Sequence, residues 1–121
     1  MRIYLLATLF IGLACLDARG AEAPLPKKFH GDWAFSPGDC QGKILENDTG
    51  VRIDGASVLA FDDACYVVKV LEDKGYALKA TFRCDQGKLS AQRTMTLKLG
   101  ADTSRLLLGE RQLFRCDAPG K

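Results

Sequence analysis

Histidine is almost absent from this sequence, since His30 is the only one in 121 residues. A Cys/His pair or a Ser/His/Asp triad would have to use that residue, which points outward from the first predicted strand beside a predicted flexible segment. The cysteines show no C-x-x-C spacing, which argues against a zinc site. We therefore expect no catalytic residues, no metal, no cofactor and no enzymatic activity.

Long charge runs are also missing, and so are long apolar runs beyond the N-terminus. The 17 Lys and Arg residues and the 15 Asp and Glu residues leave a net charge of +2 and form no cluster that would bind nucleic acid. The apolar run Ile3–Leu16 follows the positive start Met1-Arg2 and precedes small residues, which is the pattern of a secretory signal peptide. This run is too short for a comfortable transmembrane helix. We expect residues 1–20 to be a signal peptide, the rest to be periplasmic or secreted, and no stable membrane insertion.

Helical periodicity is lacking as well, because no apolar pattern of period 3.6 persists for three turns. Short alternating stretches lie between regularly spaced glycines, which is typical of antiparallel strands joined by tight turns. A meander of such strands closes best as an up-and-down barrel, since closure removes the open edges. We predict an all-β fold, a small antiparallel up-and-down barrel of roughly six to eight strands over residues 29–121. A flexible N-terminal arm, residues 21–28, is expected to precede it.

The cysteines predict two disulfides. Of the five in the sequence, Cys15 lies in the signal peptide, and the four that remain are an even number in an exported chain. A turn at Asp73-Lys74-Gly75 pairs Tyr66 with Phe82, which puts Tyr66 and Val68 on the interior face of their strand and Cys65 on the other face. Strand alternation places the last two cysteines on the interior face. The predicted pairs are therefore Cys40–Cys65 and Cys84–Cys116.

Arg93 and Glu110 are the most unusual pair in the predicted barrel. Turns at residues 85–88 and 100–103 aim both side chains inward and place them opposite each other. Charged groups inside a barrel must be paired or solvated. One interpretation is a polar anchor for a small ligand in the barrel, with Trp33 as a further lining residue. The other is a structural ion pair near an open mouth, or a bulge at Gly109 that turns Glu110 outward.

An acidic pair, Asp62 and Asp63, falls in a predicted turn. Two carboxylates can do acid–base chemistry when one of them is desolvated. Turn aspartates more commonly hydrogen-bond the local backbone, and we adopt this interpretation for the pair.

The stretch FHGDWAF alternates cleanly, with Gly31 and Trp33 on one face of the first strand. Trp33 would plug one end of the barrel, and Gly31 would let another segment approach closely. This Gly-x-Trp resembles the motif of the calycin group, which includes the lipocalins. The resemblance implies that an arginine from a late strand, Arg111 or Arg115, packs against the tryptophan.

A narrower resemblance covers Gly31 to Cys65. Gly-x-Trp followed by Cys40 and then by Ala64-Cys65 is similar to the Inh-type bacterial inhibitors of secreted zinc metalloproteases. Those inhibitors are exported eight-stranded barrels in which this cysteine pair is bonded and an N-terminal arm enters the protease cleft. The resemblance implies a partner-binding arm here, formed by Ala21, Glu22, Ala23, Pro24, Leu25 and Pro26. The C-terminal half resembles small uncharacterised exported proteins of Gram-negative bacteria.

Taken together, these patterns predict a non-catalytic exported binding module. The bulky interior side chains, among them Phe82, Leu97 and Phe114, favour a filled barrel and therefore an outer protein-binding surface. Protease inhibition is the sharpest form of that hypothesis. The alternatives are a small molecule held inside a calycin-like barrel and an exported structural protein. We expect a monomer with a protein partner and no nucleic-acid partner.

Overall fold

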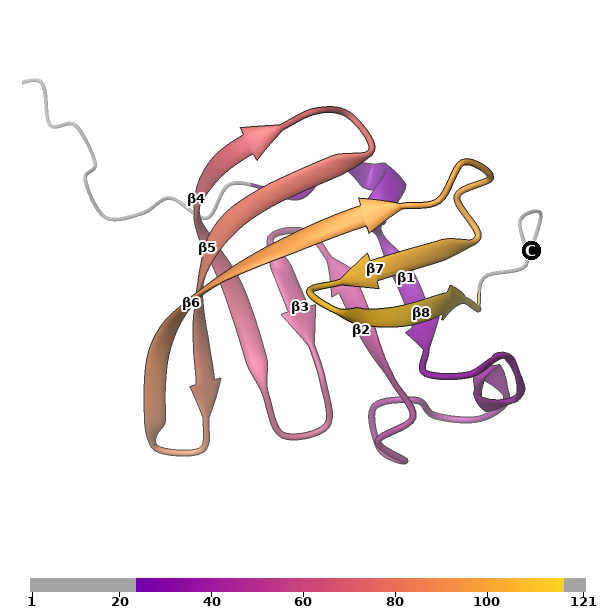
Figure 1. Ribbon diagram of the computed structural model, residues 1–121. Coiled ribbons are helices and arrows are strands. Elements are labelled where there is room, and N and C mark those ends of the chain that lie inside the picture. The colour runs from indigo at the N-terminus through magenta and orange to yellow at the C-terminus, as the bar shows by residue number, and fades with distance from the viewer. Residues whose placement is uncertain (1–23, 117–121) are drawn as a thin grey trace, which may run out of the picture.

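The computed structural model describes residues 24–116 and shows a closed eight-stranded antiparallel barrel (Figure 1). Each strand pairs with the next along the chain, and the last returns to the first, so the predicted all-β barrel is confirmed. The signal peptide and Ala21–Ala23 lie outside the described residues. Within residues 24–116, no helix is long and apolar enough to cross a membrane. The elements are η1 (Lys27–Phe29), β1 (Gly31–Ala34), η2 (Pro37–Cys40), β2 (Gly50–Asp54), β3 (Ser57–Leu59), β4 (Ala64–Asp73), β5 (Ala77–Gln86), β6 (Leu89–Leu99), β7 (Arg105–Leu108) and β8 (Arg111–Arg115).

The strands form because alternate side chains leave water. In β5, Leu78, Ala80 and Phe82 are buried, and the residues between them, such as Lys79, are exposed or half-buried. Burying a side chain such as Phe82 contributes about 2 to 3 kcal/mol relative to leaving it in water. The core continues across the other strands through Trp33, Val51, Ile53, Val58, Val67, Leu97, Leu106 and Leu113.

In the β5–β6 hairpin, the inward and outward faces are as predicted. The residues that lie opposite each other differ from the prediction, because the register is shifted. Cys84 lies opposite Ala91, whereas the predicted turn at residues 85–88 would place it opposite Leu89. The strands run on to Gln86 and Leu89, which leaves Gly87 and Lys88 as the turn, with Gly87 at φ +57°. A two-residue shift keeps every side chain on its own face, and this is why the core predicted for these strands survives.

The interior face of β4 is opposite to the predicted one. Cys65 and Val67 are 4% and 0% exposed, whereas Tyr66 and Val68 are only half-buried. Register shifts occur between residues 67 and 69 and again between residues 70 and 72. Each such irregularity breaks the simple alternation, so counting back from the turn at Gly75 gives the wrong face for the start of β4.

The disulfide pairing differs from the predicted one for the same reason. Cys65 lies directly opposite Cys84 on the interior face of the β4–β5 hairpin, and the two are bonded. Cys40 bonds Cys116, which ties the segment after β1 to the end of β8. The predicted pairs Cys40–Cys65 and Cys84–Cys116 are therefore wrong, although all four cysteines do pair. Two disulfides are consistent with folding in an oxidising compartment.

The described part of the N-terminal arm is packed against the barrel. Leu25 is 2% exposed, and its N–H donates to the Gly55 carbonyl at 2.8 Å. His30 Nε2 donates to the Leu25 carbonyl at 2.7 Å, and Phe29 of η1 is fully buried. The expected flexible arm is therefore wrong for Leu25–Lys28, because burial of two apolar side chains fixes a segment whose proline content alone favours mobility.

Two glycines set the path of β1. Gly31 has φ +128°, in the region that favours glycine. Gly50 of β2 allows the close approach that was expected at Gly31, because a Cβ on Gly50 would overlap the Trp33 carbonyl oxygen. The backbones of β1 and β2 can therefore pair beside the bulky Trp33.

Candidate binding site at the barrel mouth

One end of the barrel is closed around Trp33. The Trp33 side chain is fully buried, and its Nε1–H donates to the Phe29 carbonyl at 2.9 Å. The Arg115 guanidinium carbon lies 4.2 Å from the centre of the Trp33 ring. These contacts place Trp33 beside η1, where the chain enters β1. Arg115 is the arginine that stacks on it.

The opposite end, here called the mouth, holds a cavity of about 330 Å³. This volume lies within the range of roughly 300 to 1,000 Å³ that is usual for small-molecule pockets. The filled interior expected from the sequence is found at the closed end, and at the mouth that expectation is wrong. The apolar lining consists of Phe35, Val51, Val58, Met95, Leu108 and Leu113, with smaller contributions from Ala60 and Cys65.

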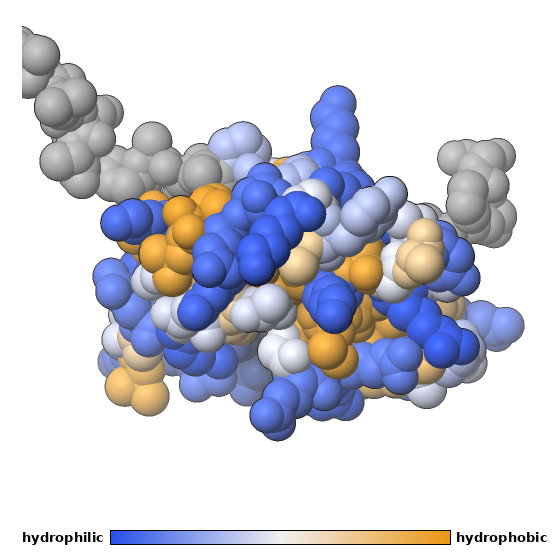
Figure 2. Space-filling model, turned by 45° about the horizontal axis from the view of Figure 1, so that its top comes forward, coloured by the Kyte–Doolittle hydropathy of each residue, from blue (hydrophilic) through white to orange (hydrophobic). Residues whose placement is uncertain are grey.

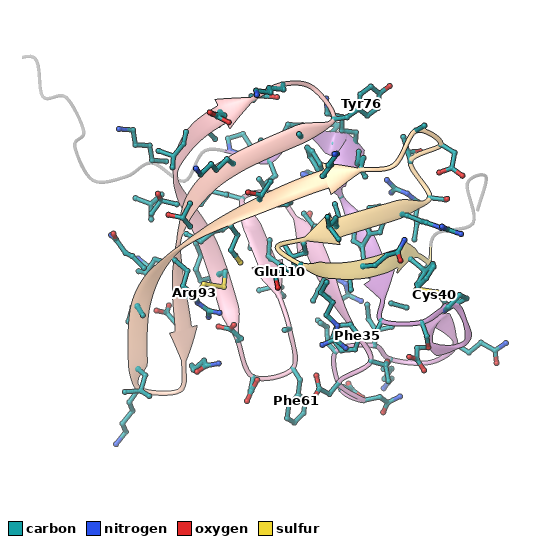
Figure 3. All side chains as sticks on the ribbon, in the orientation of Figure 1. Phe35, Cys40, Phe61, Tyr76, Arg93 and Glu110 are labelled. Atoms are coloured by element: carbon teal, nitrogen blue, oxygen red, sulfur yellow. A yellow bond between two sulfur atoms is a disulfide. The ribbon has the colours of Figure 1, made fainter. Side chains whose placement is uncertain are left out.

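Arg93 lines this cavity with a different partner from the predicted one. Its Nη2 donates to Asp63 Oδ2 at 2.7 Å. Glu110 is exposed in the turn between β7 and β8, where Gly109 has φ +62° (Figure 3). The predicted Arg93–Glu110 pair is wrong because β7 ends at Leu108 and its alternation does not continue through the turn. Asp63, which was expected to bond its local backbone, reaches β6 with its carboxylate.

Arg111 is the second cation at the mouth. Its guanidinium carbon lies 3.6 Å from the centre of the Phe35 ring, a close cation–π contact. Within residues 24–116, Arg111 makes no salt bridge. The charged side chains that line the cavity are two arginines and one aspartate, so its formal charge is +2 − 1 = +1. An apolar lining with one excess guanidinium suits a group that has an apolar body and an anionic end.

The Cys65–Cys84 disulfide lies beside the cavity. Ligand-type atoms of Asp63, Cys65 and Cys84 fall within 4.8 Å of one another. Metal ions bind cysteine as the thiolate, and both of these sulfurs are bonded to each other. The cluster therefore offers a metal only one carboxylate, which already pairs with Arg93.

Arg52 and Asp102, which lie outside the cavity lining, have shifted pKa values. The hydrogen bond to Asp32 and the charge of its carboxylate raise the pKa of Arg52, whose Nε lies 2.7 Å from Asp32 Oδ1. The Ser104 backbone N–H and hydroxyl donate to Asp102 and lower the pKa of that carboxyl. The first hydrogen bond joins β2 to β1 on the outer surface, and the other two lie within the turn before β7.

The structure separates the three side chains that the sequence groups as interior liners. Trp33 lies at the closed end, Arg93 lies at the mouth, and Glu110 does not line the cavity. The sequence analysis missed Phe35 and Arg111 as mouth residues. The alternation of FHGDWAF carries a signal for Phe35, because that residue shares the inward face of Trp33 and lies nearer the following turn.

No protein-family model matches this chain, and no curated protein or solved structure was found to be similar to it.

Proposed function

We propose that this protein is a non-catalytic exported binding module, periplasmic or secreted, whose ligand site is the mouth cavity. The observation that carries this proposal is the partly open cavity of about 330 Å³ at the mouth, whose lining is mostly apolar. Of the two arginines that line the cavity, Arg93 pairs with Asp63, and Arg111, which stacks on Phe35, has no carboxylate partner among the described residues. The ligand that fits has an apolar body and an anionic end.

The exposed hydrophobic side chains of the outer surface are scattered. On the face seen in Figure 2, hydrophobic residues form separate small patches between hydrophilic side chains. The large hydrophobic side chains that are exposed come from different turns and strands, and such scattered residues are normal on soluble proteins. They are Phe61, Leu71, Tyr76, Leu89 and Leu107.

A fluorescence titration with anilinonaphthalene sulfonate tests the mouth site, because this probe combines an apolar body with one negative charge. The probe should bind at one site and be displaced by dodecanoate. Met95→Trp should abolish binding, since the larger ring fills the cavity. Thr96→Trp is the matched control, because Thr96 is exposed on the same strand and does not line the cavity, and it should bind as the original chain does.

The proposed contact between Arg111 and the anionic end of the ligand is tested separately with Arg111→Gln. Loss of a charge-assisted contact predicts roughly a tenfold weaker affinity for the probe, with little change in the affinity for an uncharged apolar probe such as N-phenylnaphthylamine. Equal binding of anilinonaphthalene sulfonate to the original chain and to Met95→Trp contradicts the proposed site.

Inhibition of a secreted zinc metalloprotease is a second candidate function, and it would use the opposite end of the barrel. Leu25 anchors the chain at the closed end, and Pro24 is exposed just before it. This anchor fixes the position of Pro24 beside the closed end. The candidate is supported by the resemblance over Gly31 to Cys65, and the Cys40–Cys116 bond departs from the pairing that the resemblance implies.

Peptide hydrolysis by a panel of secreted zinc metalloproteases, measured with and without this protein, tests the second candidate. Inhibition that persists in Met95→Trp and weakens in Leu25→Asp would support it. Undiminished hydrolysis across the panel would remove it and leave the mouth site unaffected.

A further inference from the structure

Among residues 24–116, no strand pairs with the outer side of β6 over more than half of its length. β6 pairs with β5 from Leu89 to Lys98. On its other side it pairs with β7 only at residues 97–99. In Figure 1, β7 and β8 lie beside one end of β6, and the other end runs on with β5 into the hairpin turn. Among the described residues, the outer edge of β6 is therefore open from Leu89 to Met95.

The open edge presents backbone groups that are ready to pair. The Thr96 carbonyl accepts the Gly109 N–H at 2.8 Å, so the backbone of Thr96 points to the outer side of β6. Backbone direction alternates along an antiparallel strand, which turns the N–H and C=O of Ser90, Gln92 and Thr94 to the same side. A row of such groups is a template for a further strand. This segment contains no proline, and its one charged residue is Arg93, which already pairs with Asp63.

The open edge borders the mouth cavity. Arg93 and Met95 project from the same segment of β6 into the cavity lining. A second hollow of about 160 Å³, lined by Cys84, Leu89 and Ala91, also includes Arg93. The two hollows therefore meet at Arg93. A strand added to this edge would lie beside the mouth, with alternate side chains facing the cavity.

We propose that the open edge of β6 binds an extended peptide segment, which continues the sheet and places an apolar side chain in the mouth cavity. This inference rests on the proposed function of the mouth and names the chemical class of its ligand. Backbone hydrogen bonds to Ser90, Gln92 and Thr94 align the segment, and the cavity selects its side chains. The formal charge of +1 in the cavity lining calls for one carboxylate, with Arg111 as its partner.

The geometry defines the peptide sequence that fits. The outward backbone groups of the open edge run from Ser90 to Thr94, and the side chains of an added strand alternate between the mouth and solvent. Opposite Met95 the segment needs an apolar side chain that fills the cavity. Two residues away on the same face it needs a small side chain beside Arg93, which Asp63 already pairs, or an acidic side chain directed to Arg111 in the same cavity lining. The expected pattern is therefore apolar, any residue, then acidic or small.

Selection from a random twelve-residue peptide library, with protein purified from the periplasm of a producing bacterium as the bait, tests the proposal. The enriched peptides should share this alternating pattern. A synthetic enriched peptide is then titrated against the original chain and against Gln92→Pro, which removes an outward N–H and leaves the β5 ladder intact. We expect at least a tenfold loss of affinity. Gln92→Ala keeps the N–H and should bind as the original chain does.

A second variable keeps the test independent of how well Gln92→Pro folds. N-methylation of the peptide at alternate residues removes the donors that face β6, and methylation at the intervening residues does not. Only the first series should lose binding. Equal loss in both series, or full binding of the peptide by a folded Gln92→Pro, overturns the edge as the docking site.

The same variants titrated with anilinonaphthalene sulfonate separate this inference from the proposed function. If the probe binds and no peptide is enriched, the peptide inference is wrong and the mouth site stands. If neither binds, both are wrong. A chain that dimerises through β6, shown by a dimer in Gln92→Ala and a monomer in Gln92→Pro, also overturns the proposal, because the occupant is then a second copy.

Discussion

The guanidinium of Arg115 stacks on Trp33 at 4.2 Å and donates to three backbone carbonyls. The acceptors are Lys28 and His30, on the segment that leads into β1, and Thr103 in the turn before β7, at 2.7, 2.9 and 2.9 Å respectively. One side chain therefore joins the start of the barrel to its end. The planar fork of arginine is required for this set of contacts, because lysine carries no comparable arrangement of donors.

Replacing Arg115 with Ala should destabilise the fold by about 2 to 3 kcal/mol, because part-buried carbonyls lose charged donors and Trp33 loses its stacked cation. Arg115→Lys should recover only part of this loss. The matched control is Arg111→Ala, which removes an exposed cation stacked on Phe35 and should cost less than about 1 kcal/mol. Urea unfolding of the three variants measures the difference, and equal costs for Arg115→Ala and Arg111→Ala would refute the role of Arg115.

The two disulfides should differ in their contribution to stability. Cys40–Cys116 spans 76 residues and Cys65–Cys84 spans 19. By loop-closure entropy these stabilise the fold by about 4.5 and about 3 kcal/mol. The paired variants C40A/C116A and C65A/C84A should therefore unfold at different urea concentrations, with the first less stable. Proteolytic mapping without reductant checks the connectivity, and a peptide that joins Cys40 to Cys65 would contradict it.

The ion pair between Arg93 and Asp63 should couple the two residues weakly. The Arg93 side chain is 45% exposed and that of Asp63 is 18% exposed, so solvent screens the attraction. A double-mutant cycle of Arg93→Ala and Asp63→Ala should give a coupling of about 0.5 to 1 kcal/mol. The same cycle with Glu110→Ala in place of Asp63→Ala should give a coupling near zero, and a larger coupling there would favour the pair predicted from the sequence.

Asp102 should titrate below the ordinary aspartate value of 3.8, because the Ser104 N–H and hydroxyl bond its charged form. A lowered folded-state pKa means that this contribution is present above the unfolded-state pKa and is lost as the pH falls through the folded-state pKa. Titration of the Asp102 carboxyl by NMR measures the shift. Ser104→Ala should bring the pKa back toward its ordinary value, and an unchanged pKa would assign the shift to another cause.

Local pattern predicted the parts of this fold that depend on uninterrupted alternation. The sequence identified the inward residues of β5 and the participation of all four cysteines of the barrel in disulfides, although not their partners. It failed at β4, where two register shifts reverse the face of Cys65, and at Gly109, where a tight turn removes Glu110 from the strand. Such irregularities are set by the fit of neighbouring strands and leave little local signal.

The cavity itself could not be predicted from the pattern of residues. Alternation predicts which side chains face inward, and it says nothing about how completely those side chains fill the space between strands. Met95 and Leu108 are inward residues of the predicted kind, yet they line an opening of about 330 Å³ and are only partly buried. The choice of Arg115 over Arg111 as the partner of Trp33 likewise depends on where β8 meets β1.

The most direct measurement of the central claim is a map of backbone amide NMR shifts of the exported, oxidised chain during titration with dodecanoate. Binding in the mouth predicts saturable shifts at Phe35, Met95, Leu108 and Arg111, with the amides of Leu25 and Phe29 unchanged at the closed end. Shifts centred on the closed end, or a linear drift without saturation spread over the surface, would contradict the assignment of the mouth cavity as the binding site.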